Sequence, residues 1–275
     1  MDDLALLSEH PTTLIYEATD THGIMYPRDA DFRRELFVEE SMEHMSKNNL
    51  YQVQDLYRLV TKPGDTILDP MSGTGSLMMA AAEGRTVILM ELQPFFHQIQ
   101  QKNLAKMSAN NQMANVFLLE GDCRDYLPFT CDHVIFSPPY STSQGKKDIN
   151  DKATRELLDP KTIEAWSRYD EVKGNLGSLN NFRYAREMKK IYGLLYQSVR
   201  PGGTVTVIIK DVTEKGERVW LGNWAWRQLL LAGFEAHYWF KRFVRGTGFQ
   251  EMRRNKGLAT VDDEDMIIVR KPDEI

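Results

Sequence analysis

Short apolar runs alternate along the chain with stretches in which apolar residues recur at helical spacing, beginning near residue 50. The short runs are rich in β-branched residues and end at polar residues, glycine or proline, which is typical of strands. They predict strands at residues 66–69, 86–91, 116–120, 133–136 and 204–210. The longer stretches predict helices at residues 50–61, 76–83, 94–109, 184–199 and 219–232, with Gly233 as a left-handed cap after the last helix.

This alternation is typical of an α/β domain with a mostly parallel sheet and helices on both faces. Two more strands, at residues 234–243 and 265–271, are predicted to close the chain as an antiparallel pair, so that the sheet has seven strands. Segments 141–183 and 244–264 find no place in this sheet. The first is polar and too long for a simple connection, so it is either a functional insert or disordered.

The composition is that of a soluble globular protein, with 42% hydrophobic and 27% charged residues among 275. Because the net charge is −5, a polyanionic partner would need a local basic patch. The two cysteines, Cys123 and Cys131, have neither metal-binding nor disulfide spacing and are expected to be small core or loop residues. No signal peptide or membrane span is recognisable, so we expect a cytoplasmic protein without a membrane or metal partner.

Polar residues and glycines follow the first three predicted strands. The stretch GDTILDPMSGTGSLMMAA contains a strand that ends at Asp69 and a turn with Gly73 and Gly75, where the backbone can approach a ligand closely. Glu91 ends the second strand, near the spacing at which an acidic residue binds ribose hydroxyls in nucleotide-binding α/β folds. Asp122 follows the third strand. Parallel strands end at one edge of a sheet, so these acids are predicted to line one crevice with Ser137.

The fourth strand ends in the stretch HVIFSPPYSTSQG. Two consecutive prolines restrict the backbone there, so Ser137 and the Pro138 carbonyl are predicted to be fixed hydrogen-bond acceptors before Pro139. The exocyclic amine of a nucleobase is a poor nucleophile because its lone pair is delocalised into the ring. Two acceptors that bind its N–H groups would localise that lone pair, and Tyr140 offers a ring face on which the base can stack.

Together these residues resemble the S-adenosylmethionine-dependent DNA amino-methyltransferases, which methylate cytosine N4 or adenine N6. The resemblance extends from about residue 50 to the C-terminus and includes the stretch RPGGTVTVIIKD. It implies a Rossmann-like methyltransferase fold in one catalytic domain over residues 1–275, and Ser137, Pro138, Pro139 and Tyr140 as catalytic residues. It also implies a cofactor site at Asp69, Pro70, Met71, Gly73, Gly75, Glu91, Leu92, Asp122 and Cys123. Segment 44–49 partly resembles the family's cofactor-covering loop, but His44 is expected to be a surface residue.

A serine at the first position of the catalytic motif favours cytosine N4 over adenine N6 in this family. Carbon-5 methylation is disfavoured because its cysteine nucleophile usually follows proline, and the chain contains no Pro-Cys pair. Methylation of an RNA base or of a protein glutamine remains an alternative, since both present a planar amine. A catalytically silent nucleic-acid-binding subunit is a further alternative, although it would not need an intact catalytic motif.

Double-stranded DNA is the expected partner, with the target base flipped out of the helix. The segment KRFVRGTGFQEMRRNKG contains six cations and one acid and is predicted to be a basic loop that contacts phosphates. Its cations are Lys241, Arg242, Arg245, Arg253, Arg254 and Lys256. The insert at 141–183 is predicted to recognise the target sequence. A cognate restriction nuclease is a possible further partner, and either a monomer or a homodimer is compatible with the sequence.

Overall fold

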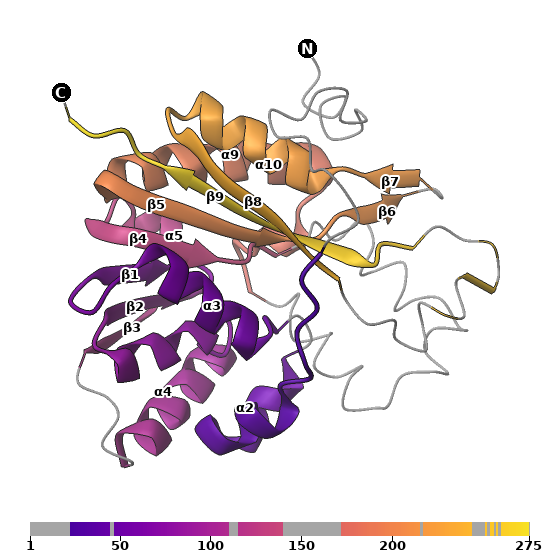
Figure 1. Cartoon of the computed structure of the whole chain (residues 1–275). Coiled ribbons are helices and arrows are strands. Elements are labelled where there is room, and N and C mark those ends of the chain that lie inside the picture. The colour runs from indigo at the N-terminus through magenta and orange to yellow at the C-terminus, as the bar shows by residue number, and fades with distance from the viewer. Residues whose placement is uncertain are drawn as a thin grey trace.

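The structure is a computed structural model that describes residues 23–44, 47–109, 115–139, 172–214, 217–243, 251, 254–255, 257 and 260–274. A seven-stranded sheet in the order β3-β2-β1-β4-β5-β9-β8 runs through it (Figure 1). Its strands are β1 Thr66–Asp69, β2 Thr86–Glu91, β3 Val116–Glu120, β4 Cys131–Phe136, β5 Val199–Ile209, β8 Glu235–Phe243 and β9 Asp263–Arg270. The first five are parallel, and β9 is antiparallel to both β5 and β8. The predicted fold class and the antiparallel pair are thereby confirmed.

The strands divide the core into two layers because successive side chains point to opposite faces of the sheet. In β2, Val87 and Leu89 belong to one hydrophobic cluster, whereas Ile88 and Met90 belong to the other. The first cluster is covered by α3 Leu50–Val60, η2 Ser76–Glu83 and α4 Pro94–Ala109, and the second by α5 Cys123–Tyr126, α9 Asn181–Ser198 and α10 Leu221–Leu231. Figure 1 shows the helices on the two sides of the sheet, so both faces are covered as predicted.

Several boundaries differ from the prediction. Strand β5 begins at Val199, earlier than residue 204, and pairs with β4 through a register shift between Cys131 and His133. The helix predicted at 76–83 is a 3-10 helix between left-handed Gly75 and Gly84. Gly233 has φ +111°, as expected for a left-handed cap.

Six short elements among the described residues were not predicted. They are α2 Ala30–Leu36, η1 Glu39–Glu43, α5 Cys123–Tyr126, η3 Leu176–Ser178, and the hairpin of β6 Val212–Glu214 with β7 Glu217–Val219. Residues 172–183, the end of the predicted insert, form η3 and the start of α9. Within the residues that the structure describes, no helix is both long enough and apolar enough to cross a membrane.

Candidate functional site

The carboxyl ends of the parallel strands bring the predicted polar residues to one edge of the sheet, here called the carboxyl edge. Asp69 and Glu91 are the last residues of β1 and β2, whereas Asp122 and Ser137 follow β3 and β4. These four strands are neighbours in the order β3-β2-β1-β4. The predicted crevice residues therefore lie along a continuous part of this edge, where open α/β sheets bind their ligands.

The glycine turn after β1 is held by a network of hydrogen bonds. Gly73 and Gly75 have φ of +53° and +83°, a conformation that glycine adopts without strain. From α4, the Gln100 side chain donates to Ser72 Oγ at 2.8 Å and to the Gly73 carbonyl at 2.6 Å. Asn103 donates to the Thr74 carbonyl at 2.8 Å. The turn is thus fixed by two buried amides of the following helix, Gln100 and Asn103, which were not among the predicted site residues.

Two buried carboxylates flank this turn. Glu91 accepts the Gly73 backbone N–H at 2.7 Å and the Gln93 backbone N–H at 2.8 Å, and Asp69 accepts the Met71 N–H at 3.0 Å. Burial raises the pKa of Glu91 to about 7, and burial together with the charge of Glu91 raises the pKa of Asp69 to about 8. Hydroxyl or amine donors of a ligand would favour the ionised forms of these carboxyl groups.

A second layer of polar residues lies beneath the turn. His44 is buried, contrary to the expectation of a surface residue, and a Cβ on Gly73 would lie 3.0 Å from its Nε2. Burial and the cations Lys47 and Arg33 lower the pKa of His44 to about 3, so the imidazole is neutral. Buried Arg33 donates to Ser76 Oγ at 3.1 Å and to the Asn48 carbonyl at 2.6 Å. The partial resemblance of segment 44–49 to the cofactor-covering loop was the sequence signal for this layer.

Asp122 has a different environment. Arg124 donates to both of its carboxylate oxygens and also to Glu187 on α9 at 2.9 Å and to the Gly174 carbonyl at 3.0 Å. The hydrogen bonds and charge of Arg124 outweigh burial and hold the pKa of Asp122 below its ordinary value. Burial raises the pKa of the adjacent Cys123 thiol to about 12, so this thiol is not a nucleophile at neutral pH.

The predicted catalytic motif begins at the end of β4, which lies between β1 and β5 in the sheet. Ser137 is partly exposed, Pro138 is buried and Pro139 is partly exposed. Ser137 therefore lies at the carboxyl edge, beside the strand that leads into the glycine turn. Tyr140 lies outside the described residues, as do residues 141–171 of the predicted insert.

The described cations of the predicted basic loop are paired with acids. Lys241 lies 2.9 Å from Asp265, Arg242 lies 3.0 Å from Glu264, and Arg254 lies 2.6 Å from Asp262. In the first two pairs the residues face each other across β8 and β9. Arg245, Arg253 and Lys256 lie outside the described residues.

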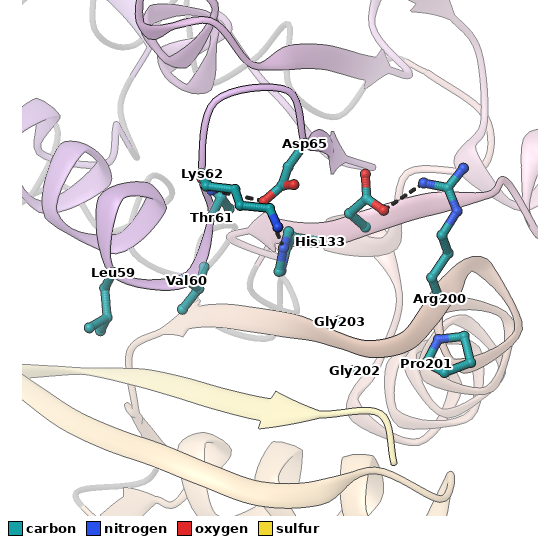
Figure 2. A pocket seen from close by; sticks show the side chains of 11 residues that line it. Leu59, Val60, Thr61, Lys62, Asp65, His133, Arg200, Pro201, Gly202 and Gly203 are labelled. Atoms are coloured by element: carbon teal, nitrogen blue, oxygen red, sulfur yellow. Dashed lines mark hydrogen bonds and ion pairs between the residues drawn. The ribbon is translucent and has the colours of Figure 1, made fainter. Parts of the chain in front are cut away.

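A groove of about 480 Å³ lies at the opposite edge of the sheet, lined by residues 59–62, 65, 132, 133 and 200–203 (Figure 2). Two pairs of polar groups line it: Arg200 lies 2.5 Å from Asp132, and the His133 imidazole lies 3.3 Å from the Asp65 carboxylate. The groove is at the amino ends of β1, β4 and β5, away from the carboxyl edge. It is therefore a separate feature from the candidate site.

The chain is similar to several known proteins. The family described as conserved hypothetical protein 95 matches residues 43–196, more than half of the 275 residues. The type II methyltransferase M.BglI from Bacillus subtilis is 37% identical over 68 residues, which are 24% of this chain and 20% of that protein. The match thus spans about a fifth of that relative's length.

Solved structures share the fold at low identity. A SAM-dependent methyltransferase from Methanosarcina mazei has a TM-score of 0.50 and 10% identity, over 80% of this chain and 98% of that one. A methyltransferase from Pyrococcus furiosus has a TM-score of 0.47 and 16% identity, over 83% of this chain and 87% of that one.

S-adenosylmethionine is the cofactor of this family and fold. The carboxyl edge fits it: Gly73 and Gly75 in the turn carry no side chains that would cover its backbone, and Glu91 and Asp69 are buried acceptors suited to hydroxyl and amine donors. Asp122 retains acceptor capacity beside Arg124, because a carboxylate has about four lone-pair sites. The chain belongs to the family described as conserved hypothetical protein 95 and has the fold of S-adenosylmethionine-dependent methyltransferases.

Proposed function

We propose that this protein is an S-adenosylmethionine-dependent DNA methyltransferase that methylates the N4 amine of a flipped-out cytosine. The observation that carries the proposal is the position of Ser137-Pro138-Pro139 at the end of β4, beside the strand that leads into the glycine turn. The match to a type II methyltransferase over 68 residues supports the coarser part of this proposal, a methyltransferase activity.

The chain's own residues have distinct roles in this proposal. Glu91 would hold the ribose of the cofactor, Asp122 its adenine and the turn at Gly73 and Gly75 its methionine part. When bound, S-adenosylmethionine supplies a methyl group on a sulfonium sulfur. The Ser137 hydroxyl and the Pro138 carbonyl accept the two N–H groups of the cytosine amine and localise its lone pair for attack.

Other assignments of the proposal concern residues outside the described part of the chain. Tyr140 follows Pro139 directly in the sequence and is assigned to stacking on the flipped base. The segment 141–171 is assigned to recognition of the target sequence. Arg245, Arg253 and Lys256 are assigned to phosphate contact. A smaller share is assigned to Lys241, Arg242 and Arg254, because each of them is paired with an acid.

Product analysis tests the proposal. Purified protein is incubated with S-adenosylmethionine carrying a labelled methyl group and with plasmid DNA, and the DNA is digested to nucleosides. We expect labelled N4-methylcytosine. Labelled N6-methyladenine would move the assignment to adenine, and label in RNA or in glutamine but not in DNA would overturn the DNA assignment.

The Ser137→Ala variant tests the role of the hydroxyl. Loss of one hydrogen bond to the reacting amine should lower the transfer rate about 100-fold and leave cofactor binding unchanged. Thr130→Ala is the matched control, because it removes an exposed hydroxyl at the other end of β4. Equal transfer rates in the two variants would remove Ser137 from the mechanism.

A further inference from the structure

The first half of α9 carries a compact set of exposed cations, here called the α9 basic face. It consists of Arg183, Arg186, Lys189 and Lys190, all exposed, with the exposed ring of Phe182 beside them. The spacings i, i+3, i+4 and i+7 place these five side chains within about a third of the helix circumference. The cations are therefore displayed together, although the whole chain has a net charge of −5.

Burial of the opposite side fixes the orientation of this face. Tyr184, Met188, Ile191 and Leu195 are buried in the hydrophobic cluster beneath α9. Because these side chains are anchored in the core, the helix cannot rotate to hide its cations without exposing them. The packing of α9 therefore holds the α9 basic face at the surface.

The charge of this face is only partly neutralised. Glu187 lies 2.9 Å from Arg124, 3.3 Å from Arg186 and 3.1 Å from Lys190, so one acid is shared by three cations. Arg183 and Lys189 make no ion pair with another described residue. The exposed Lys173 is next to Gly174, whose carbonyl accepts from Arg124, and adds another positive charge nearby. Excess positive charge with an exposed aromatic ring is the pattern that binds a nucleic-acid backbone.

The face is also close to the candidate site. Helix α9 joins the parallel strands β4 and β5, so it must begin at the carboxyl edge and run back toward the other edge. Arg124 confirms this position, because it bonds both Asp122 at the carboxyl edge and Glu187 in the second turn of α9. A polymer bound over Ser137 would pass the start of α9.

We propose that the α9 basic face binds the phosphate backbone of the DNA duplex that carries the target base. The inference rests on the proposed function and adds to it the surface that holds the polymer. The strongest contacts come from Arg183 and Lys189, because no described acid competes for them. Arg186 and Lys190 contribute through the part of their charge that the shared Glu187 does not neutralise.

Salt-dependent binding to a fluorescent DNA duplex tests this inference. The quadruple variant Arg183→Gln, Arg186→Gln, Lys189→Gln and Lys190→Gln removes the cations of the face. The matched control removes the same number of charges from α3, α4 and the groove at the opposite edge, by Arg58→Gln, Lys62→Gln, Lys102→Gln and Arg200→Gln. The slope of log K against log salt concentration should become shallower by about 2 to 4 in the quadruple variant and by less than about 1 in the control.

A variant with two substitutions instead of four keeps the test valid if the quadruple variant is unstable. Arg183→Gln with Lys189→Gln breaks no described ion pair and should flatten the slope by about 1 to 2. Unchanged slopes in both variants, or equal losses in the control, would overturn the inference. Failure of the proposed function is a separate result: wild-type protein would then bind DNA through α9 but form no methylated base.

Discussion

Two groups of acids at the carboxyl edge are held in opposite ways. Beside the glycine turn, Asp69 and Glu91 are buried and accept backbone N–H groups, and neither has a cationic partner among the described residues. Beside α9, Asp122 and Glu187 are paired with Arg124. Accordingly, the pKa is raised in the first pair of acids and lowered in the second.

This difference is consistent with the proposed roles of the two groups. Unpaired buried carboxylates can bind neutral hydroxyl and amine donors, which a cofactor presents in a fixed geometry. Paired carboxylates instead set how much positive charge remains for a polyanion. The α9 basic face keeps an excess because three cations share Glu187, whereas Lys241 and Arg242 each face an acid across the sheet.

The largest expected effect is a pH dependence of stability that comes from Asp69 and Glu91, the buried acids beside the glycine turn. In the folded chain the pKa is about 8 for Asp69 and about 7 for Glu91, against ordinary values of 3.8 and 4.5. At a pH between the ordinary and the raised pKa, these carboxyl groups are protonated in the folded chain and ionised in the unfolded chain. The free energy of unfolding should therefore fall as pH rises. The two acids together should lower it by roughly 6 kcal/mol between about pH 5 and 8.

Urea unfolding of the cofactor-free protein over this pH range measures that loss. Glu91→Gln cannot ionise, so the decline should be shallower in this variant. Glu35→Gln is the control, because Glu35 is exposed and its substitution should leave the pH profile unchanged. A wild-type stability that rises with pH would contradict the buried, unpaired state of the two acids.

Removing an acid from an ion pair should lower stability at Glu264 and tighten DNA binding at Glu187. Glu264 accepts from Gln52 and from Arg242, which is mostly buried, so Glu264→Gln should cost about 2 kcal/mol of unfolding free energy. Glu187→Gln releases Arg186 and Lys190 at the surface and should tighten DNA binding several-fold. Urea denaturation measures the stability of both variants, and duplex titration measures their DNA affinity. Tighter DNA binding by Glu264→Gln but not by Glu187→Gln would contradict the prediction.

A smaller effect is expected from the glycine turn. Gly73→Ala places a methyl group 3.0 Å from His44 Nε2 at a φ of +53°, so the turn must shift. A cost of about 1 to 2 kcal/mol should appear as roughly tenfold weaker binding of S-adenosylmethionine. Gly64→Ala has a φ of +94° but no atom near the added methyl group. Calorimetric titration should show normal cofactor binding in this control, and equal weakening in both variants would exclude a role for the contact with His44.

The sequence predicted those features whose cause is local. Strands β1, β2 and β3 have the predicted bounds, because apolar runs and the polar residues after them specify a strand and its end together. The positions of Asp69, Glu91 and Ser137 follow from these bounds, since parallel strands end at one edge. Helix α4 was also predicted, but not the role of its buried Gln100 and Asn103 in holding the turn.

Features that depend on distant partners could not be predicted. The sequence predicted Arg242 as a cation of the basic loop. In the structure its partners are Glu264 and Gln52, and Gln52 is 190 residues away in the sequence. Buried Arg33 likewise depends on Ser76 and the Asn48 carbonyl. The α9 basic face did have a local signal, the i, i+3, i+7 spacing of Arg183, Arg186 and Lys190, which a search for continuous basic runs overlooks.

The smallest effect is expected at Arg254, where the two sets of proposed DNA contacts can be compared directly. Arg254 is paired with Asp262 at 2.6 Å, and both side chains are well exposed, so the pair should contribute less than about 0.5 kcal/mol to stability. Because Asp262 already neutralises this cation, Arg254→Gln should change the salt slope of DNA binding by about 0.3 or less, against about 0.9 for Lys189→Gln. Duplex titrations of the two single variants over the same salt series make the comparison, and a larger change at Arg254 would assign the phosphate contacts to the basic loop instead of α9.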